Sequence, residues 1–222
     1  MAPPESSVGP ELTLILEWAG PVVQQAFALA LLSEGLAMLK SKQAPVSGLG
    51  FTSTCSCCLT WMAYGVAIGS PSIWVPNFAG FVIGTLTTLI FLSYTDQPMG
   101  TTLLIMLTAG GAVLALMFGD VLPADEAQQW TANIGIVQAI VMLGSGAAVW
   151  PTVLREGNAS ALSLPMSLAG MFQGACWAAF GLLVLHDANI YGPNLVGMGF
   201  NLVNLALAAY FPSGTSPKAA KA

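Results

Sequence analysis

The chain has 222 residues, of which 55% are hydrophobic and only 7% charged, with a mean hydropathy of +0.76 and a formal net charge of -5. A soluble domain carries about a quarter of charged residues, so this composition excludes an ordinary soluble protein and places the chain in a lipid bilayer. The acidic balance excludes nucleic acid as a partner, because nucleic acid requires a basic surface.

Apolar segments of about 20 residues, the length that a helix needs to cross the hydrocarbon core, follow one another along the chain. Seven are predicted, at about residues 18–39, 51–68, 75–94, 101–119, 132–153, 162–185 and 190–210. Residues 1–17 form an N-terminal tail, expected to be disordered over 1–14, and residues 212–222 form a C-terminal tail. The first residues lack the basic start of a secretory signal, so no cleaved peptide is expected.

The four cysteines lie inside these apolar segments, three of them close together at Cys55, Cys57 and Cys58 and the fourth at Cys176. The only histidine is His186, and no second cluster of ligands accompanies the cysteines, so the thiols are expected to pack as small side chains and to bind no metal. No glycine-rich phosphate loop, zinc-protease helix or nucleophile motif occurs. We therefore expect neither an enzyme nor a cofactor.

Two stretches, beginning at Trp61 and Trp177, repeat one pattern. The first reads WMAYG, a short gap, PNFAG and an apolar run that ends on a tyrosine, and the second reads WAAFG, a short gap, PNLVG and a similar run. Tryptophan and asparagine are 16 positions apart in the first copy (Trp61, Asn77) and 17 in the second (Trp177, Asn194). Self-similarity on this scale indicates an internally duplicated fold.

The duplication explains the unmatched fourth segment. Residues 18–96 and 123–211 form two units of three helices, and the linker at residues 97–122 supplies one helix without a counterpart. Because three is odd, units joined directly would be inverted, whereas one extra crossing lets both run the same way, as in the parallel repeats of some transporters. The sequence predicts an all-α integral membrane fold of seven transmembrane helices, arranged as two parallel three-helix repeats joined by a linker helix.

The basic residues predict the orientation of these helices. With the N-terminus outside, all five fall in the inside connectors and the C-terminal tail, as Lys40, Lys42, Arg155, Lys218 and Lys221. The positive-inside rule therefore predicts an outside N-terminus and a cytosolic C-terminus.

The doubled motif, the linker between its copies and the run HDANIYGPN before the last helix together resemble the SWEET sugar transporters over about residues 18–211. The resemblance implies facilitated, energy-independent movement of mono- or disaccharides by alternating access. We expect a sugar and the lipid bilayer as partners, a homo-oligomer, and the plasma membrane as location, with an endomembrane or the vacuole as alternatives.

In that family an asparagine on the third helix of each unit and an aromatic residue on the second line the central pocket. These roles fall here on Asn77, Asn194, Trp61 and Trp177. A carboxamide offers donors and acceptors to sugar hydroxyls, and an indole face can stack on a sugar ring. The alternatives are helix-to-helix hydrogen bonding for the asparagines, which is also expected of Asn201 and Asn204, and core packing for the tryptophans. Cys57 and Gln173, one helical turn before each tryptophan, are expected to be secondary pocket residues.

The resemblance also implies hinge prolines near the inner gate. Pro151 and Pro165 fit this feature in the second unit. In the first unit Glu34 stands where one proline is expected, and Gly50 closes the stretch where the other would fall. Glycine also permits a helix to bend, so hinging is expected to survive at Gly50.

One alternative function stays open at this stage. The chain also fits a related PQ-loop carrier for amino acids or other polar solutes, with Glu34 as a proton-coupled carboxylate. Glu34 lies about one and a half turns from Lys40, so an acid that reaches the inner interface is the favoured explanation. A retinal protein is excluded, because the last span contains no lysine.

Overall fold

The part of the chain that the structure describes is almost entirely helical. The computed structural model describes residues 8–44, 49–96, 100–144, 147 and 149–211. These residues form eight α-helices and one π turn, with no strand among them, which confirms the predicted all-α class. The C-terminal tail, with Lys218 and Lys221, lies outside the described residues.

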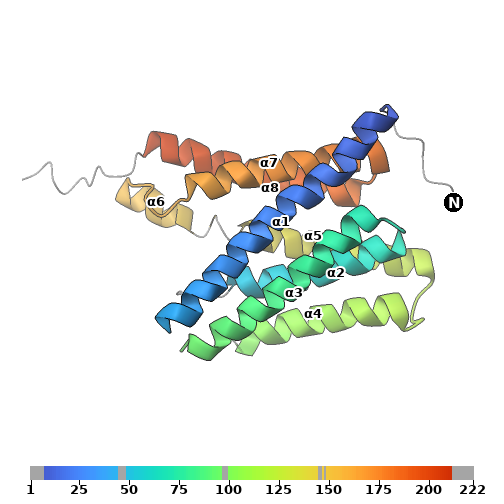
Figure 1. Ribbon diagram of the computed structural model, residues 1–222, viewed down its shortest axis with the longest axis horizontal. Coiled ribbons are helices and arrows are strands. Elements are labelled where there is room, and N and C mark those ends of the chain that lie inside the picture. The colour runs from blue at the N-terminus through green and yellow to red at the C-terminus, as the bar shows by residue number, and fades with distance from the viewer. Residues whose placement is uncertain (1–7, 45–48, 97–99, 145–146, 148, 212–222) are drawn as a thin grey trace, which may run out of the picture. The chain divides into compact units, whose positions relative to one another are not determined.

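The helices follow the order of the predicted spans (Figure 1). They are α1 (Pro10–Ser41), α2 (Leu49–Ala67), α3 (Pro71–Tyr94), α4 (Gly100–Phe118), α5 (Ala124–Gly144), α6 (Trp150–Glu156), α7 (Leu164–Phe180), the π turn η2 (Gly181–Leu185) and α8 (Ala188–Tyr210).

The first helix begins earlier than the sequence predicted. It starts at Pro10, eight residues before the expected start at residue 18, so the N-terminal tail is shorter than expected. Proline suits the first helical position, where no amide hydrogen is needed, and Glu11 in the first turn interacts favourably with the helix dipole. The Thr13 hydroxyl also donates to the carbonyl of Gly9 at 3.1 Å, which ties the start of the helix together.

The predicted fifth span is divided into two helices. α5 ends at Gly144 and α6 begins at Trp150, with Pro151 in its first turn. Proline in a helix interior removes a hydrogen bond and clashes with the preceding turn, so a new helix with Pro151 in its first turn is less costly than a continuous one. The span also begins earlier than expected, at Ala124, with acidic residues in its first turn.

The chain packs into two compact units, a larger unit (residues 17–142) and a smaller unit (residues 1–16 and 143–222). In the larger unit α2 lies along α3 and also packs against α4 (Figure 1). The buried face of α2 carries small hydroxyl side chains, at Thr52, Ser53, Ser56 and Thr60. Small side chains allow helices to approach closely, which is the usual basis of packing in a membrane where water does not drive helices together.

An apolar cluster lies at one end of the larger unit. Met38, Phe51 and Phe91 pack together from the end of α1, the start of α2 and the end of α3. At the same end, Lys42 Nζ donates to the Tyr94 hydroxyl at 3.0 Å. α1 and α3 therefore finish on the same side of this unit, and α2 runs in the opposite direction between those ends.

The smaller unit is built on the pair α7 and α8. Glycines lie where the two helices meet: a Cβ on Gly174 would lie 3.1 Å from the backbone oxygen of Asn194, and a Cβ on Gly170 would lie 2.7 Å from Asn201 Nδ2, so that side chain would have to shift. α6 is attached to α8 by a hydrogen bond from Trp150 Nε1 to Asn204 Oδ1 at 2.6 Å. Asn204 thus joins two helices, as the sequence predicted.

The exterior of the helices is apolar. Large apolar side chains such as Leu29, Leu89 and Phe172 are more than half exposed, while hydroxyl side chains such as those of Thr60 and Thr87 are buried, which is the reverse of a soluble protein. Three helices of the described residues are long and apolar enough to cross a membrane, namely Pro10–Ser41, Pro71–Tyr94 and Leu164–Leu185.

Candidate functional site

The first copy of the repeated motif folds into the hairpin of α2 and α3, inside the larger unit. The Trp61 ring lies edge-on to Tyr64, with centroids 5.6 Å apart and an interplanar angle of 87°. Asn77 on α3 is buried, and its Nδ2 donates to the carbonyl of Ile73, one turn earlier, at 2.8 Å. Because a carbonyl oxygen can only accept, this bond holds the carboxamide in one orientation.

The second copy folds into the hairpin of α7, η2 and α8, inside the smaller unit. Trp177 lies edge-on to Phe180, with ring centroids 6.1 Å apart and an interplanar angle of 63°. Asn194 Nδ2 donates to the carbonyl of Ile190 at 2.8 Å. The two copies therefore share the asparagine bond to its own helix and an edge-on aromatic partner three residues after the tryptophan.

In each hairpin the two helices approach closely at the glycine that ends the tryptophan motif. A Cβ on Gly65 would lie 2.7 Å from the backbone nitrogen of Trp74, and a Cβ on Gly181 would lie 2.8 Å from that of Tyr191. Contacts this short do not occur for real Cβ atoms, so only glycine allows the two helices to approach at this point. These glycines set the distance between the helix with the tryptophan and the helix with the asparagine.

The one-residue difference between the copies lies in the turn. The amide of Ser70 donates to the carbonyl of Gly65 and that of Asp187 to Gly181, both at 2.9 Å, across five residues in the first hairpin and six in the second. The second hairpin takes up its extra residue in the π turn η2. Beyond the turn the copies are in register again, because each asparagine follows seven residues after Ser70 or Asp187.

The two expected secondary residues lie one turn before the tryptophans. Cys57 is buried and interacts with the Trp61 side chain, whereas Gln173 is only half-buried on α7. α5 also contacts Trp61, because a Cβ on Gly135 would lie 3.1 Å from the indole Cε2. One edge of the Trp61 indole is therefore packed against a helix backbone in the larger unit.

Two amide side chains that contact this region were missed in the sequence. Gln24 on α1 donates from Nε2 to Asn77 Oδ1 at 3.1 Å. Gln138 on α5 is buried and donates to the hydroxyl of Ser56 at 2.9 Å. The signal was present, since an amide inside an apolar span must find a partner, but the sequence does not show which one.

The two stretches that contain the repeated motif match a known protein family. A family model described as "Sugar efflux transporter for intercellular exchange" matches residues 36–99 and 131–216, more than half of the chain, and each stretch contains one copy of the motif. The chain belongs to the SWEET family. The mouse protein "Sugar transporter SWEET1" is 29% identical over 196 residues, which cover 84% of this chain and 87% of that protein.

Other SWEET relatives extend the similarity. The rice protein "Bidirectional sugar transporter SWEET2b" is 27% identical over 201 residues, which cover 87% of each protein. A solved structure of a eukaryotic SWEET transporter matches with a TM-score of 0.74 and 27% identity, over 90% of this chain and 96% of that one. Membership of this family makes the chain an integral membrane transporter and not an enzyme.

The hinge residues implied by the SWEET resemblance differ between the two halves. Pro151 and Pro165 each stand in the first turn of a helix, at the starts of α6 and α7. Glu34 is exposed in the interior of the continuous helix α1. Gly50 lies in the first turn of α2, where its carbonyl accepts from the Thr54 hydroxyl at 2.7 Å and a Cβ would meet open space. Gly50 and Pro165 therefore both lie at helix starts, whereas Glu34 lies inside a continuous helix and Pro151 at the start of α6.

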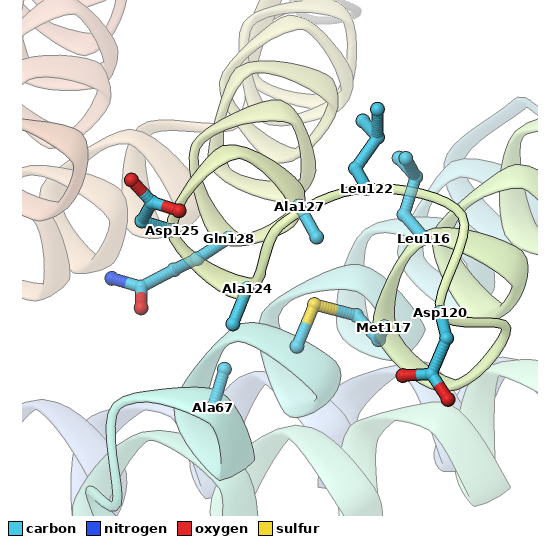
Figure 2. Close-up of a pocket in the computed structure, with 9 residues that line it drawn as sticks. All are labelled: Ala67, Leu116, Met117, Asp120, Leu122, Ala124, Asp125, Ala127 and Gln128. Carbon is cyan, nitrogen blue, oxygen red and sulfur yellow. The ribbon is translucent and has the colours of Figure 1, made fainter.

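A cavity of about 370 Å³ lies elsewhere in the larger unit, between the end of α2, the end of α4 and the start of α5. Its lining combines apolar side chains with three polar ones, Asp120, Asp125 and Gln128 (Figure 2). None of the expected sugar-site residues lines it. This cavity is therefore separate from the tryptophan and asparagine positions.

Proposed function

We propose that this SWEET protein is a facilitative carrier of mono- or disaccharides that works by alternating access. The observation that carries the proposal is the duplicated hairpin, which carries Trp61 and Asn77 in one copy and Trp177 and Asn194 in the other, with the same asparagine bond to its own helix. Two equivalent half-sites suit a substrate that carries hydroxyl groups on both sides of a ring. The names of the mouse and rice relatives, which describe sugar transporters, support the same substrate class.

The chemistry of the two half-sites suits a sugar. The bond to its own helix uses one N–H of each carboxamide and leaves the other N–H free to donate, while Oδ1 can accept. A sugar hydroxyl needs both a donor and an acceptor, and vicinal hydroxyls present them in pairs. In the proposed pocket Asn77 and Asn194 bind hydroxyls, and the two indoles stack on the apolar faces of the ring, with Cys57 and Gln173 as secondary contacts.

The proposed transmembrane arrangement is two parallel three-helix repeats joined by α4. The contacts of Lys42 with Tyr94 and of the Ala159 amide with the Phe211 carbonyl, at 3.0 Å and 3.1 Å, support it, because each ties the start of a connector to the end of the third helix of a repeat. With Lys40, Lys42 and Arg155 inside, the hairpin turns lie outside and the C-terminus is cytosolic. An epitope at the C-terminus should then be detected only in permeabilised cells, and labelling of intact cells would overturn the arrangement.

Alternating access requires a place where the helices can change direction. The junctions at Pro151 and Pro165 are proposed to supply it in the second repeat, and Gly50 with the stretch around Glu34 in the first. Rocking of the repeats about these points would expose the pocket to one side at a time. The plasma membrane and a homo-oligomeric assembly are the proposed setting.

Uptake in cells that lack their own sugar carriers tests the proposal. Radiolabelled glucose and sucrose should both be offered, and the sugar that is carried should move in either direction without accumulation above its external concentration. A protonophore should leave the rate unchanged, and so should Glu34→Gln, which keeps the size of the side chain and removes the charge. Accumulation that a protonophore abolishes, and that is lost in Glu34→Gln, would instead establish the proton-coupled PQ-loop carrier.

A further inference from the structure

We propose that Gln24 on α1 is a positioning residue for Asn77, and that it thereby sets the sugar affinity of the first half-site. The inference rests on the proposed function, because it concerns the same asparagine. Its basis is the hydrogen bond from Gln24 Nε2 to Asn77 Oδ1 at 3.1 Å, inside the larger unit.

The direction of every bond in this group is determined by chemistry. The Ile73 carbonyl can only accept, so the atom of Asn77 that contacts it at 2.8 Å is Nδ2. Asn77 Oδ1 must then accept, and the Gln24 group that meets it must be the donating NH2. Two partners on opposite sides of one carboxamide leave it no free rotation about its last bond. A single N–H and a single lone pair of Asn77 stay available, which is the pair that one sugar hydroxyl requires.

The packing around Gln24 keeps this bond in place. A Cβ on Gly80, one turn beyond Asn77 on α3, would lie 3.8 Å from Gln24 Nε2, so the amide lies directly on the face of α3. The neighbouring Gln25 donates from its Nε2 to the carbonyl of Pro76 at 3.4 Å. Both glutamines are half-buried and both fasten α1 to α3, but only Gln24 touches the side chain that is proposed to bind sugar.

The second half-site is built differently. Among the described residues, Asn194 has the bond to the Ile190 carbonyl as its only side-chain hydrogen bond. No described side chain of a neighbouring helix in the smaller unit donates a hydrogen bond to its Oδ1. Both asparagines make the same bond to their own helix, but only Asn77 also accepts a bond from a neighbouring helix among the described residues. Loss of Gln24 should therefore affect the first half-site alone.

The experiment compares Gln24→Met with Gln25→Met in the full-length protein. Methionine keeps the length and the unbranched shape of glutamine and removes the donor, so the two variants lose one hydrogen bond each at adjacent positions of α1. The KM and the maximal rate of radiolabelled glucose uptake are measured, or of sucrose uptake if the wild type carries sucrose, with the rate normalised to the amount of protein in the membrane. We expect Gln24→Met to raise KM by roughly 3- to 10-fold, the effect of one neutral hydrogen bond, at an unchanged normalised maximal rate. Gln25→Met should leave KM at the wild-type value.

A merely structural role gives a different result, because loss of helix packing lowers the amount of protein or the maximal rate in both variants alike. Equal KM values in the wild type and Gln24→Met, or equal increases in both variants, would overturn the role of Gln24 and leave the proposed function intact. Absence of sugar uptake by the wild type would overturn the proposed function and this role with it. If Gln24→Met does not reach the membrane, Gln24→Asn replaces it with Gln25→Asn as control. The asparagine side chain is one methylene shorter than glutamine and does not reach Asn77. The same KM comparison then tests the role of Gln24.

Discussion

The two hairpins of this SWEET protein agree where the helices touch and differ in what surrounds them. Gly65 and Gly181 bring their helices to nearly the same distance, with a hypothetical Cβ 2.7 Å and 2.8 Å from a backbone nitrogen. The asparagines make the same bond of 2.8 Å to their own helices. Among the residues that the structure describes, only the first hairpin has a third helix bonded to its asparagine, and only the second contains a π turn. The duplication thus repeats the local geometry of the motif, while each copy has its own supporting contacts.

The same contrast extends to the first helix of each repeat. α1 continues for 32 residues through Glu34, whereas its counterpart is divided between α5 and α6 at Pro151. α6 is a short helix of seven residues, held to α8 through Trp150 and Asn204. The two repeats therefore differ in the continuity of their first helix.

The largest expected effect comes from removing the feature that the two hairpins share. Asn77→Ala or Asn194→Ala should each nearly abolish sugar uptake while the protein still reaches the membrane. Each change leaves sugar hydroxyls unpaired in a dry pocket, a loss of about 1–3 kcal/mol or roughly 5- to 150-fold in uptake. Asn201→Ala is the matched control, because Asn201 makes a similar bond to its own helix, at 2.9 Å to Gly197, and is not assigned to the pocket. A variant of Asn77 or Asn194 with wild-type uptake would show that this asparagine only joins helices.

The glycine contacts test whether the hairpins are equally packed. Gly65→Ala and Gly181→Ala should each lower the free energy of unfolding by about 1–3 kcal/mol, because the added methyl would overlap backbone. Gly192→Ala, in α8 with no atom within 4 Å of its Cβ position, should be neutral or stabilising. Thermal unfolding of the purified protein, followed by the monodisperse fraction after heating, measures the difference. Unequal losses at Gly65 and Gly181 would mean that the two turns are not equivalent.

The helix caps after the two turns should differ in importance. The Asp187 side chain accepts from the Asn189 amide at 2.9 Å, whereas Ser70 makes no side-chain cap bond to α3. Asp187→Ala should therefore cost about 1 kcal/mol of stability through the loss of its cap bond. Ser70→Ala removes no cap bond and acts only through the 3.0 Å bond between the buried hydroxyls of Ser70 and Ser72. The same thermal assay measures both variants, and an unchanged stability of Asp187→Ala would contradict a role of the Asp187 cap.

The smallest effect is expected from removing the extra residue of the second hairpin. Deletion of Val184 from η2 should convert the π turn into an α-helical end like that of the first hairpin and keep uptake within about twofold of the wild type. Deletion of Ala175, in the regular part of α7, is the control. It rotates Trp177 by about 100° relative to the start of that helix and should abolish uptake. Equal damage by both deletions would show that the π turn is itself required.

Much of the fold was predictable, because the length of each apolar segment and the internal repeat can be read directly from the sequence. The helices between residues 49 and 118, and α8, lie within a few residues of their predicted spans. The start of α1 and the break before α6 were not foreseen. Both depend on proline at a helix start, and a proline in an apolar run is compatible with a kink as well as with a new helix. The membership in the SWEET family was also predictable, from the doubled motif and its spacing.

The sequence by itself determined which residues form the candidate site, because a tryptophan and an asparagine recur at matching positions in two apolar hairpins. The tertiary structure decided how each is held. The π turn that absorbs one residue, the glycines that admit a neighbouring backbone and the bond from Gln24 to Asn77 all depend on atoms more than a few positions apart in the chain. The two residues of this bond are 53 positions apart, so no local sequence pattern predicts it. The sequence shows that an amide in an apolar helix needs a hydrogen-bond partner, but the packing of the helices determines which residue that partner is.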